Sequence, residues 1–426
     1  MTDLLERSAR YIDNGVYEGT GANNPMDTSF HEVADGIGLV CAFSHVWALH
    51  GGDGLTVFDT SLGPFGRPAV DALRRWRTEP FETLVYTHGH VDHVSGTPAF
   101  LADAEAAGHR RPTVVAHENA PTRFDRYAWT QGYNQVINQR QFGAGMDFPS
   151  EFERPDTTFA STHELAAGDH AIVLHHDRGE TDDHAWAWVP DHKAIFCGDL
   201  FIWVFPNAGN PQKVQRYAAD WAAGLRKMAA LEPELLLPAH GLPVEGRDRI
   251  ATVLDNTASA LEGLVRDTVA MMNEGATLDE IVHTVRVPDR YADLPYLRAT
   301  YDEPEFVVRN LWRLYGGWYD GNPARLKPPR DIEVATEVAS LAGGASALAA
   351  RALAVAETGD LRLACQLAEW AADALEQEGS DGAPSARSVH ETRAEVYRRR
   401  RDAESSLMSK GIYGQAAAGS EERAGG

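Results

Sequence analysis

The chain has 426 residues, of which 43% are hydrophobic and 24% are charged, and its formal net charge at pH 7 is −23. Because phosphate binding relies on clustered Lys and Arg, this acidity argues against nucleic acid as a partner.

A basic run, YRRRRD at 397–402, lies among acidic neighbours and is predicted to be the solvated face of a helix. The three cysteines are odd in number and show no CxxC spacing, so neither a disulfide framework nor a thiolate metal site is expected.

The length predicts two domains rather than one. No apolar run approaches the roughly 20 residues that cross a bilayer. The N-terminal stretch MTDLLERSARYIDNG is acidic and polar, whereas a signal peptide is basic and then apolar. We therefore expect a cytoplasmic protein without a membrane span.

Between about Gly36 and Gly241 the pattern is one of short strands and connecting helices, typical of an α/β fold. The predicted strands are rich in β-branched and aromatic residues: IGLVCAFSHVWAL, GLTVFDT, FETLVYT, PTVVAHE, HAIVLHH and the hairpin-like AWAWVPDHKAIFCGD. Helices are predicted at PAVDALRRWR and at QKVQRYAADWAAGLRKMAAL.

After Gly241 the strand signal stops and apolar residues recur every three or four positions, which predicts a helical second domain. TLDE at Thr277 to Glu280 is a capping box, and two later helices are expected to meet at Gly359. From about Gly414 the composition suggests disorder. The predicted division is 1–245 for a catalytic domain, 246–400 for a helical domain and 401–426 for a partly disordered tail.

The segment THGHVDH directly follows the apolar strand TLVYT and concentrates ligand side chains at the end of that strand. Residues two apart on an extended segment project to the same side, so His88 and His90 can hold one ion. Asp92 and His93, beyond the turn, can hold a second. The alternative, a histidine-rich surface loop, is hard to reconcile with a HxHxDH pattern after an apolar strand.

With this motif, residues 30–245 resemble the metallo-β-lactamase superfamily. Three other landmarks of that family match: Asp59 in GLTVFDT, Asp199 in AIFCGDL and His240 in LLLPAHG. The resemblance implies an αββα sandwich, with Asp199 bridging two metal ions. It also implies that Asp59 orients a ligand histidine through its second ring nitrogen.

One landmark differs, because RGETDDH places Glu180 where superfamily hydrolases usually carry a histidine. A carboxylate here resembles the alkylsulfatase-like branch, whose two acidic ligands are 19 residues apart, and 199 − 180 = 19. The alternative left open by the sequence is that Glu180 faces solvent and His184 is the ligand.

The helical half resembles the alkylsulfatase dimerisation domain, in particular at GGWYDGNPARL, residues 316–326. The expected architecture is therefore a metallo-β-lactamase αββα sandwich followed by an all-α dimerisation domain. The aromatic residues between Phe306 and Trp318 predict a homodimer with an apolar interface.

The resemblance implies a dinuclear metal-dependent hydrolase that acts on a sulfate ester or another small ester. Two divalent cations, expected to be zinc with iron or manganese as alternatives, would acidify a shared water so that hydroxide attacks. Asp92 and Asp59 are the predicted catalytic residues. The predicted ligands are His88, His90 and Glu180 on one ion, Asp92, His93 and His240 on the other, and Asp199 between them.

In alkylsulfatases a loop after the bridging acid holds the sulfate oxygens, which implies substrate contacts for Asn207, Asn210, Lys213 and Arg216. The position of a second arginine falls on Pro211, which would weaken a bidentate grip. A lid with Tyr133 and Arg140 is hypothesised at 132–143, with an ordinary polar loop as the alternative. His117 is either a cleft residue or a structural histidine.

Two other functions stay open at this level. A shell of four histidines and three carboxylates also suits a diiron oxidoreductase or oxygenase, although the sequence shows no electron-transfer module. The second is a non-catalytic interaction module on the same scaffold. All seven ligand positions carry residues that can bind a metal, which argues against this alternative. The sequence does not name the small-molecule substrate.

Overall fold

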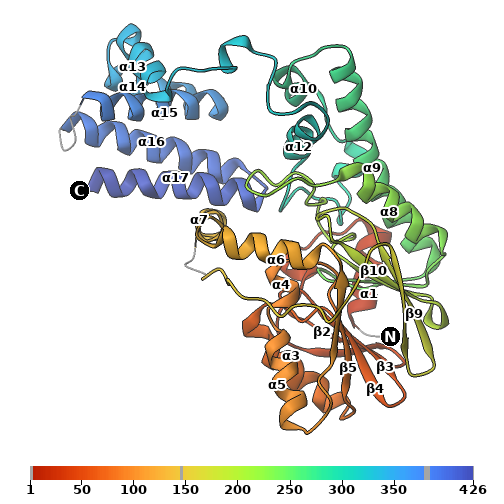
Figure 1. The fold of residues 1–426 in the computed structure, drawn as a ribbon. Coiled ribbons are helices and arrows are strands. Elements are labelled where there is room, and N and C mark those ends of the chain that lie inside the picture. Colours follow the sequence, from red (N-terminus) through yellow and green to blue (C-terminus); the bar gives the residue numbers. More distant parts are fainter. Residues whose placement is uncertain (1–2, 144–146, 379–383, 426) are drawn as a thin grey trace. The chain divides into compact units, whose positions relative to one another are not determined.

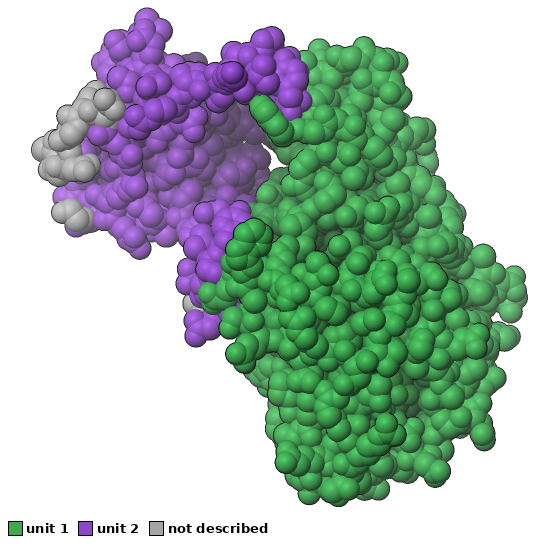
Figure 2. All heavy atoms as spheres, viewed as in Figure 1, with its two compact units in different colours: residues 1–131, 149–318 green, residues 132–148, 319–426 purple. Residues whose placement is uncertain are grey.

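The computed structural model describes residues 3–143, 147–378 and 384–425, and the chain divides into two compact units (Figure 2). The first unit comprises residues 1–131 and 149–318, and the second comprises 132–148 and 319–426. The division therefore differs from the predicted boundary at 245. The long helix at residues 247–273 and the three shorter helices between residues 278 and 316 belong to the first unit. The helices that follow residue 318 belong to the second.

Two sheets lie at the centre of the first unit (Figure 1). The first sheet has the order β1 to β7, and its strands from β4 onward are parallel. The second has the order β13-β12-β11-β10-β9-β8, with β11 and β12 parallel. The strands are β1 (Phe30–Ala34), β2 (Ile37–Val40), β3 (Val46–Gly51), β4 (Gly54–Phe58), β5 (Phe81–Val85), β6 (Thr113–His117), β7 (Thr157–Phe159), β8 (Thr162–Ala167), β9 (His170–His176), β10 (Ala185–Val189), β11 (Ala194–Gly198), β12 (Leu235–Pro238) and β13 (Val244–Glu245).

Side chains alternate along the first sheet between two hydrophobic cores, as the period of a strand requires. On β3, Trp47 enters the core between the sheets, whereas Ala48 faces the core under the outer helices. On β4, Phe58 stacks on Phe196 of β11 with ring centroids 4.0 Å apart, while Val57 points the other way. Both faces of each of these strands are buried, which explains their nearly continuous apolar sequence.

Helices cover the outer faces of both sheets and complete an αββα sandwich (Figure 1). The first sheet is covered by α3 (Gly63–Trp76) and α5 (Thr97–Ala106), and the second by α1 (Asp3–Asn14), α8 (Ala218–Ala230) and α9 (Arg247–Asn273). The predicted fold class is therefore confirmed. The other helices of this unit are α2 (Thr20–Asn23), α4 (Val91–Val94), α6 (Ala120–Trp129), α10 (Leu278–Thr284), α11 (Asp289–Ala292) and α12 (Pro304–Gly316).

The second unit is helical and contains α13 (Asp331–Ala342), α14 (Ala345–Glu357), α15 (Leu361–Glu378), α16 (Pro384–Ala403) and α17 (Leu407–Gly425). The expected disorder of the tail is wrong: α17 is a helix with buried Met408 and Ala417. Its partner α16 carries the basic run, whose arginines pair with acidic side chains such as Glu395, Glu404 and Glu421. Arg398, Arg399 and Arg401 are partly exposed, as a solvated face requires, whereas Arg400 and Glu404 are largely buried.

Three local predictions can be compared with the structure. The capping box of Thr277 and Glu280 is present, and Gly359 separates α14 from α15. The helix predicted from residue 212 begins only at Ala218. The residues before it form a loop in which Arg216 donates to Glu180 and the backbone accepts from Asn310. The segment 132–143, hypothesised to be a lid, lies largely in the helix α7 (Gln131–Phe142), and its role as a lid stays a prediction.

No single helix in the described part of the chain combines the length and apolarity needed to cross a bilayer. Among the described helices, α13 and α14 have the required length and apolarity only when they are taken together, and they are bent by 86° relative to each other.

Candidate metal centre

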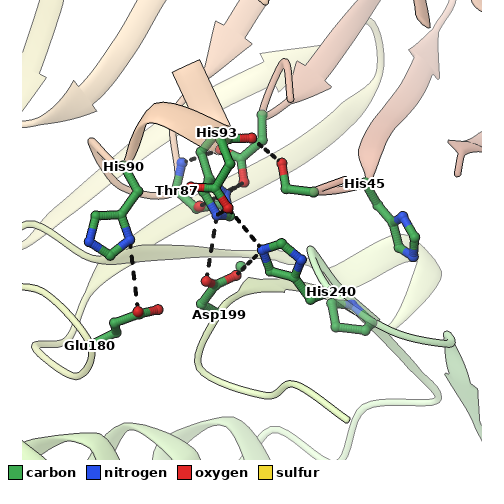
Figure 3. Close-up of polar contacts among 12 residues, drawn as sticks. His45, Thr87, His90, His93, Glu180, Asp199 and His240 are labelled. Atoms are coloured by element: carbon green, nitrogen blue, oxygen red, sulfur yellow. Dashed lines mark hydrogen bonds and ion pairs between the residues drawn. The ribbon is translucent and has the colours of Figure 1, made fainter. Parts of the chain in front are cut away.

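The candidate ligands gather at the carboxyl ends of strands in both sheets. His88 and His90 follow β5, Glu180 lies between β9 and β10, Asp199 follows β11, and His240 follows β12. Because both sheets present these ends at the same edge of the sandwich, loops distant in sequence meet there. The result is a cluster of seven candidate ligands in the two groups expected from the sequence (Figure 3).

The first group consists of His88, His90, Glu180 and Asp199. His88 Nε2 and His90 Nδ1 lie 2.8 Å apart, and His90 Nδ1 lies 3.9 Å from Glu180 Oε1. Burial lowers the pKa values of both histidines well below the usual range, so their neutral, metal-binding forms are favoured.

The second group consists of Asp92, His93 and His240. His240 Nε2 lies 3.3 Å from Asp92 Oδ2, and His93 Nε2 lies 3.5 Å from the same oxygen. Asp92 and His93 are presented together by the single turn of α4. Three side chains from two separate loops thus converge on one point.

Asp199 lies between the two groups (Figure 3). Its Oδ2 is 3.9 Å from His88 Nε2 and 3.5 Å from His93 Nε2, and its Oδ1 is 3.7 Å from His240 Nε2. Oδ2 thus approaches a histidine of each group and Oδ1 a histidine of the second group, a position from which a carboxylate can bridge two cations. The geometry agrees with the bridging position that the resemblance implies.

The residues of the cluster fit divalent cations. Among the described residues, the buried atoms Glu180 Oε2, His93 Nε2 and Asp199 Oδ1 have no hydrogen-bond partner. Buried polar atoms are rarely left without a partner unless an ion or water satisfies them. Imidazole nitrogens and carboxylate oxygens are the donors that zinc, iron and manganese accept.

Asp59 fixes the orientation of His93. Its Oδ2 accepts from His93 Nδ1 at 2.7 Å, so the other ring nitrogen faces the cluster. Thr87 donates to both carboxylate oxygens, through its backbone N–H at 2.8 Å and its hydroxyl at 2.7 Å. The predicted role of Asp59, behind the ligands rather than among them, is consistent with these contacts.

Glu180 is held by two side chains of the loop that follows Asp199. Arg216 and Asn207 both donate to Glu180 Oε1, and Arg216 also donates to the backbone oxygen of Asn207 at 2.7 Å. Burial raises the pKa of Glu180 to about 7, an effect that the Arg216 guanidinium opposes. Oε1 of Glu180 is thus held by two donors, while Oε2 is buried without a hydrogen-bond partner among the described residues.

The alternative ligand, His184, has a different contact. Its Nε2 accepts from the backbone N–H of Asp199 at 3.0 Å, and burial lowers its pKa to about 4. A neutral ring that accepts from this amide positions the bridging acid. The structure therefore places Glu180 in the cluster and His184 behind Asp199.

A buried ion pair that no local sequence pattern indicates supports the His88–His90 loop. Asp183 Oδ2 accepts from the backbone N–H of Gly89 at 2.8 Å, between the two histidines. The same carboxylate pairs with Arg123 of α6 at 2.9 Å, and both side chains are almost fully buried. Its partner comes from a helix 60 residues away, so no local pattern could have revealed the pair.

A second unpredicted support holds His240. His45 donates through Nε2 to the oxygen of Gly241 at 2.9 Å, and Asn24 accepts from the N–H of Gly241 at 2.8 Å. Burial lowers the pKa of His45 to about 3, so the ring is neutral and can donate in this fixed tautomer. Ser44 donates to the backbone oxygen of Asp92 and ties the same loop to the second group.

The predicted substrate residues are brought together only in part. Asn207, Asn210 and Arg216 are buried beside Glu180 or on the same loop, and the charge of Lys213 interacts with Asp92 and Glu180. Burial and the neighbouring Arg216 lower the pKa of Lys213 to about 8. Tyr133 and Arg140 lie on α7 in the second unit, so their part in the site stays a prediction.

His117 is a structural histidine in its contacts. Its Nε2 donates to the oxygen of Ala160 at 2.9 Å, its Nδ1 accepts from Asn119, and its ring stacks on His176. Both ring nitrogens are occupied, which leaves neither for a substrate.

The fold and the cluster together define a protein of the metallo-β-lactamase type with a candidate site for two divalent metal ions. Residues 39–240 match the family described as the metallo-β-lactamase superfamily, and residues 277–423 match the family described as alkyl sulfatase dimerisation. The chain thus contains a metallo-β-lactamase domain, followed by a domain of the alkylsulfatase dimerisation type.

The similar proteins are alkylsulfatases. A linear primary-alkylsulfatase from Pseudomonas sp. is 28% identical over 75% of this chain and 64% of its own length. An (R)-specific secondary-alkylsulfatase from Pseudomonas sp. is 25% identical over 75% and 52%. The solved structure of the inverting sec-alkylsulfatase Pisa1 from Pseudomonas sp. has 22% identity and a TM-score of 0.79, covering 93% of this chain and 66% of that one. The chain thus matches about half to two thirds of these relatives' lengths.

Proposed function

We propose that the protein is a dinuclear metal-dependent hydrolase that cleaves an alkyl sulfate ester into an alcohol and inorganic sulfate. The observation that carries this proposal is Glu180 in the first ligand group, held by Arg216 and Asn207. The curated relatives named above support the sulfate ester as substrate. They do not favour the redox alternative, because their names describe sulfatases.

Two divalent cations would supply a water of lowered pKa and positive charge for the ester oxygens. His88, His90 and Glu180 would hold one cation, Asp92, His93 and His240 the other, and Asp199 would bridge them. Asp59 keeps His93 in the tautomer that binds through Nε2. His184 holds the backbone of Asp199, so the bridging carboxylate is oriented before any ion binds.

Zinc is the proposed metal, with iron and manganese as alternatives. The seven side chains offer imidazole nitrogen and carboxylate oxygen but no thiolate, a set that all three ions accept. Three carboxylates partly neutralise two dications, so the bound water should be somewhat less acidic than at a site with histidines alone.

The loop after Asp199 would receive the anionic end of the substrate. Arg216 Nε and Asn210 Nδ2 are buried donors with no hydrogen-bond partner among the described residues. Donors of this kind favour the oxygens of a sulfate group. The cation of Lys213 lies beside them and adds attraction for an anion.

The protein is proposed to act as a homodimer through its helical region, as the dimerisation family match supports. Tyr315 and Trp318, in the aromatic stretch expected at the interface, are 52% and 70% exposed in the single chain. Light scattering that shows a stable monomer at micromolar concentration would contradict this. The cytoplasmic location stays a prediction.

The decisive experiment combines metal content with a substrate panel. Protein purified without added metal or chelator is analysed by elemental mass spectrometry, and sulfate release is measured from short and long primary, secondary and aryl sulfate esters. About two zinc ions per chain and release that chelator abolishes would support the proposal. Hydrolysis of phosphate or carboxylic esters, with none of the sulfate esters, would overturn it.

A further inference from the structure

The loop between β11 and α8 carries the side chains that hold Glu180, yet residues 206–217 form neither helix nor strand. Its backbone therefore lacks the repeated hydrogen bonds that make a strand or helix rigid. Asn207 and Arg216 must nevertheless stay in place if Glu180 is to present one fixed oxygen. Something outside the loop has to supply that rigidity.

Asn310 of α12 supplies contacts at both ends of the loop. Its Nδ2 donates to the backbone oxygen of Ala208 and to the backbone oxygen of Arg216, at 2.9 Å each. The side chain is 5% exposed. One amide group thus closes the loop by joining the residue after Asn207 to Arg216 itself.

Asp302, just before α12, holds the middle of the loop. It is fully buried, and its Oδ2 accepts from the backbone N–H of Gly209 at 2.6 Å. A Cβ at Gly209 would lie 2.3 Å from the backbone of Phe306 and Val307, so the loop rests directly on α12. This close approach explains why the position holds a glycine.

The outer edge of α12 makes a further connection. Arg313 donates to Gln215 Oε1 and to Asn310 Oδ1, at 3.0 Å each, which orients the Asn310 amide so that its donor side faces the loop. Asp302, Asn310 and Arg313 all lie within residues 277–423, the range that matches the dimerisation family. Part of that range thus packs on the catalytic core.

We propose that α12 is the support of the loop that holds Glu180, with Asn310 as its positioning residue. Asn310 acts through Arg216 and Asn207, which occupy one oxygen of Glu180 and leave the other for the ion of the first group. The inference rests on the proposed metal centre and assigns to the dimerisation segment a second task, the assembly of the site.

The test is the affinity of each ion in the holoenzyme of Asn310→Leu, which keeps the branching of the side chain at Cγ but donates no hydrogen bond. Zinc is titrated out with a chelator of known affinity and counted by elemental mass spectrometry. One of the two ions should bind roughly 10–100-fold more weakly, as is usual when an outer partner of a ligand is lost. The other ion should be unaffected.

The matched control is Arg309→Ala, because Arg309 lies on the same helix but is exposed and pairs only at the surface with Glu305. It should bind both ions like the unmodified protein. If Asn310→Leu folds poorly, Asn310→Ala serves instead, and thermal unfolding is recorded for every variant.

The possible outcomes of this experiment distinguish the inference from its alternatives. Weakening of one ion without a matching loss of thermal stability supports the proposal. Unchanged affinity for both ions, or equal weakening of both together with lower thermal stability, overturns it. A wild-type protein that binds no ions overturns the metal centre, whereas two tightly bound ions without sulfatase activity overturn only the proposed substrate.

Discussion

The two ligand groups are held in different ways. The second group is supported by the sheet framework: Asp59 follows β4 and orients His93, and His45 before β3 holds the loop of His240. The first group depends on long-range partners. Arg123 of α6 supports the His88–His90 loop through Asp183, and α12 supports Glu180 through the loop that follows Asp199.

This difference in support predicts that substitutions weaken the binding of the first ion more readily than that of the second. Strand ends are fixed by many backbone hydrogen bonds, so a substitution that spares the direct supports Asp59 and His45 should disturb the second group little. The ligands of the first group are held by side chains and by loops without regular backbone hydrogen bonds. Each of these supports consists of one or two side-chain contacts. Changes far from the cluster in sequence should therefore affect the first ion before the second.

The largest effect is expected for Glu180→Ala, which removes a ligand of the first group. One ion should be lost, and activity should fall by more than the roughly 10–100-fold typical of losing an outer partner. Metal counting and sulfate release check this. Full loading with two ions in this variant would show that Glu180 is not a ligand.

Arg123→Met should destabilise the protein by about 3–5 kcal/mol, because breaking a buried pair leaves the charge of Asp183 without compensation. Arg123 and the Gly89 amide keep the pKa of Asp183 low despite its burial. Denaturant unfolding measures the loss, and the first ion should be weakened as well. The control, Arg154→Met, removes an exposed pair with Asp125 and should cost at most about 1 kcal/mol.

Asp59→Asn tests the support of the second group. The loss of the charged acceptor behind His93 should weaken the second ion by roughly 10–100-fold and leave the first bound. Chelator titration measures both affinities, with Asp53→Asn in the exposed turn before β4 as control. Weakening of the first ion alone would reverse the comparison between the groups.

The smallest effect concerns pH. Burial raises the pKa of Asp302 to about 7, although its hydrogen bonds to two backbone amides and the charge of Arg216 oppose the rise. The carboxyl therefore binds its proton more tightly in the folded state. Its stabilising contribution is complete below the unfolded pKa and is lost as pH rises through about 7.

Between pH 6 and pH 8 this one group should lower the free energy of unfolding by about 1 kcal/mol. Asp302→Asn should lack that part of the pH dependence, whereas Asp293→Asn, at an exposed site, should keep it. Unfolding curves at both pH values provide the comparison. Identical pH dependence in wild type and Asp302→Asn would show that Asp302 does not titrate in this range.

Local sequence patterns predicted the positions of ligands wherever the ligand motif directly follows a strand in the sequence. THGHVDH after TLVYT, GD after AIFC and HG after LLLPA contain six of the seven candidate ligands, because the end of a buried strand fixes the direction of the residues that follow. The family resemblance that these motifs carry implied Glu180, the grouping of the ligands and the sandwich. Local patterns failed at residues 212–217, where helical periodicity continues but contacts with Glu180 and Asn310 hold a loop.

The sequence by itself therefore determined the α/β layout and the ligand motif at residues 87–93, since both depend on neighbouring residues and on burial. The family resemblance that it carries implied the sandwich, the other ligands and the departure at Glu180. Only the tertiary structure decided how those ligands are held. The pairs Asp183 with Arg123 and Asn310 with Arg216 join residues 60 and 94 positions apart. No propensity or spacing records such a contact, because it depends on the path of the whole chain between the two residues.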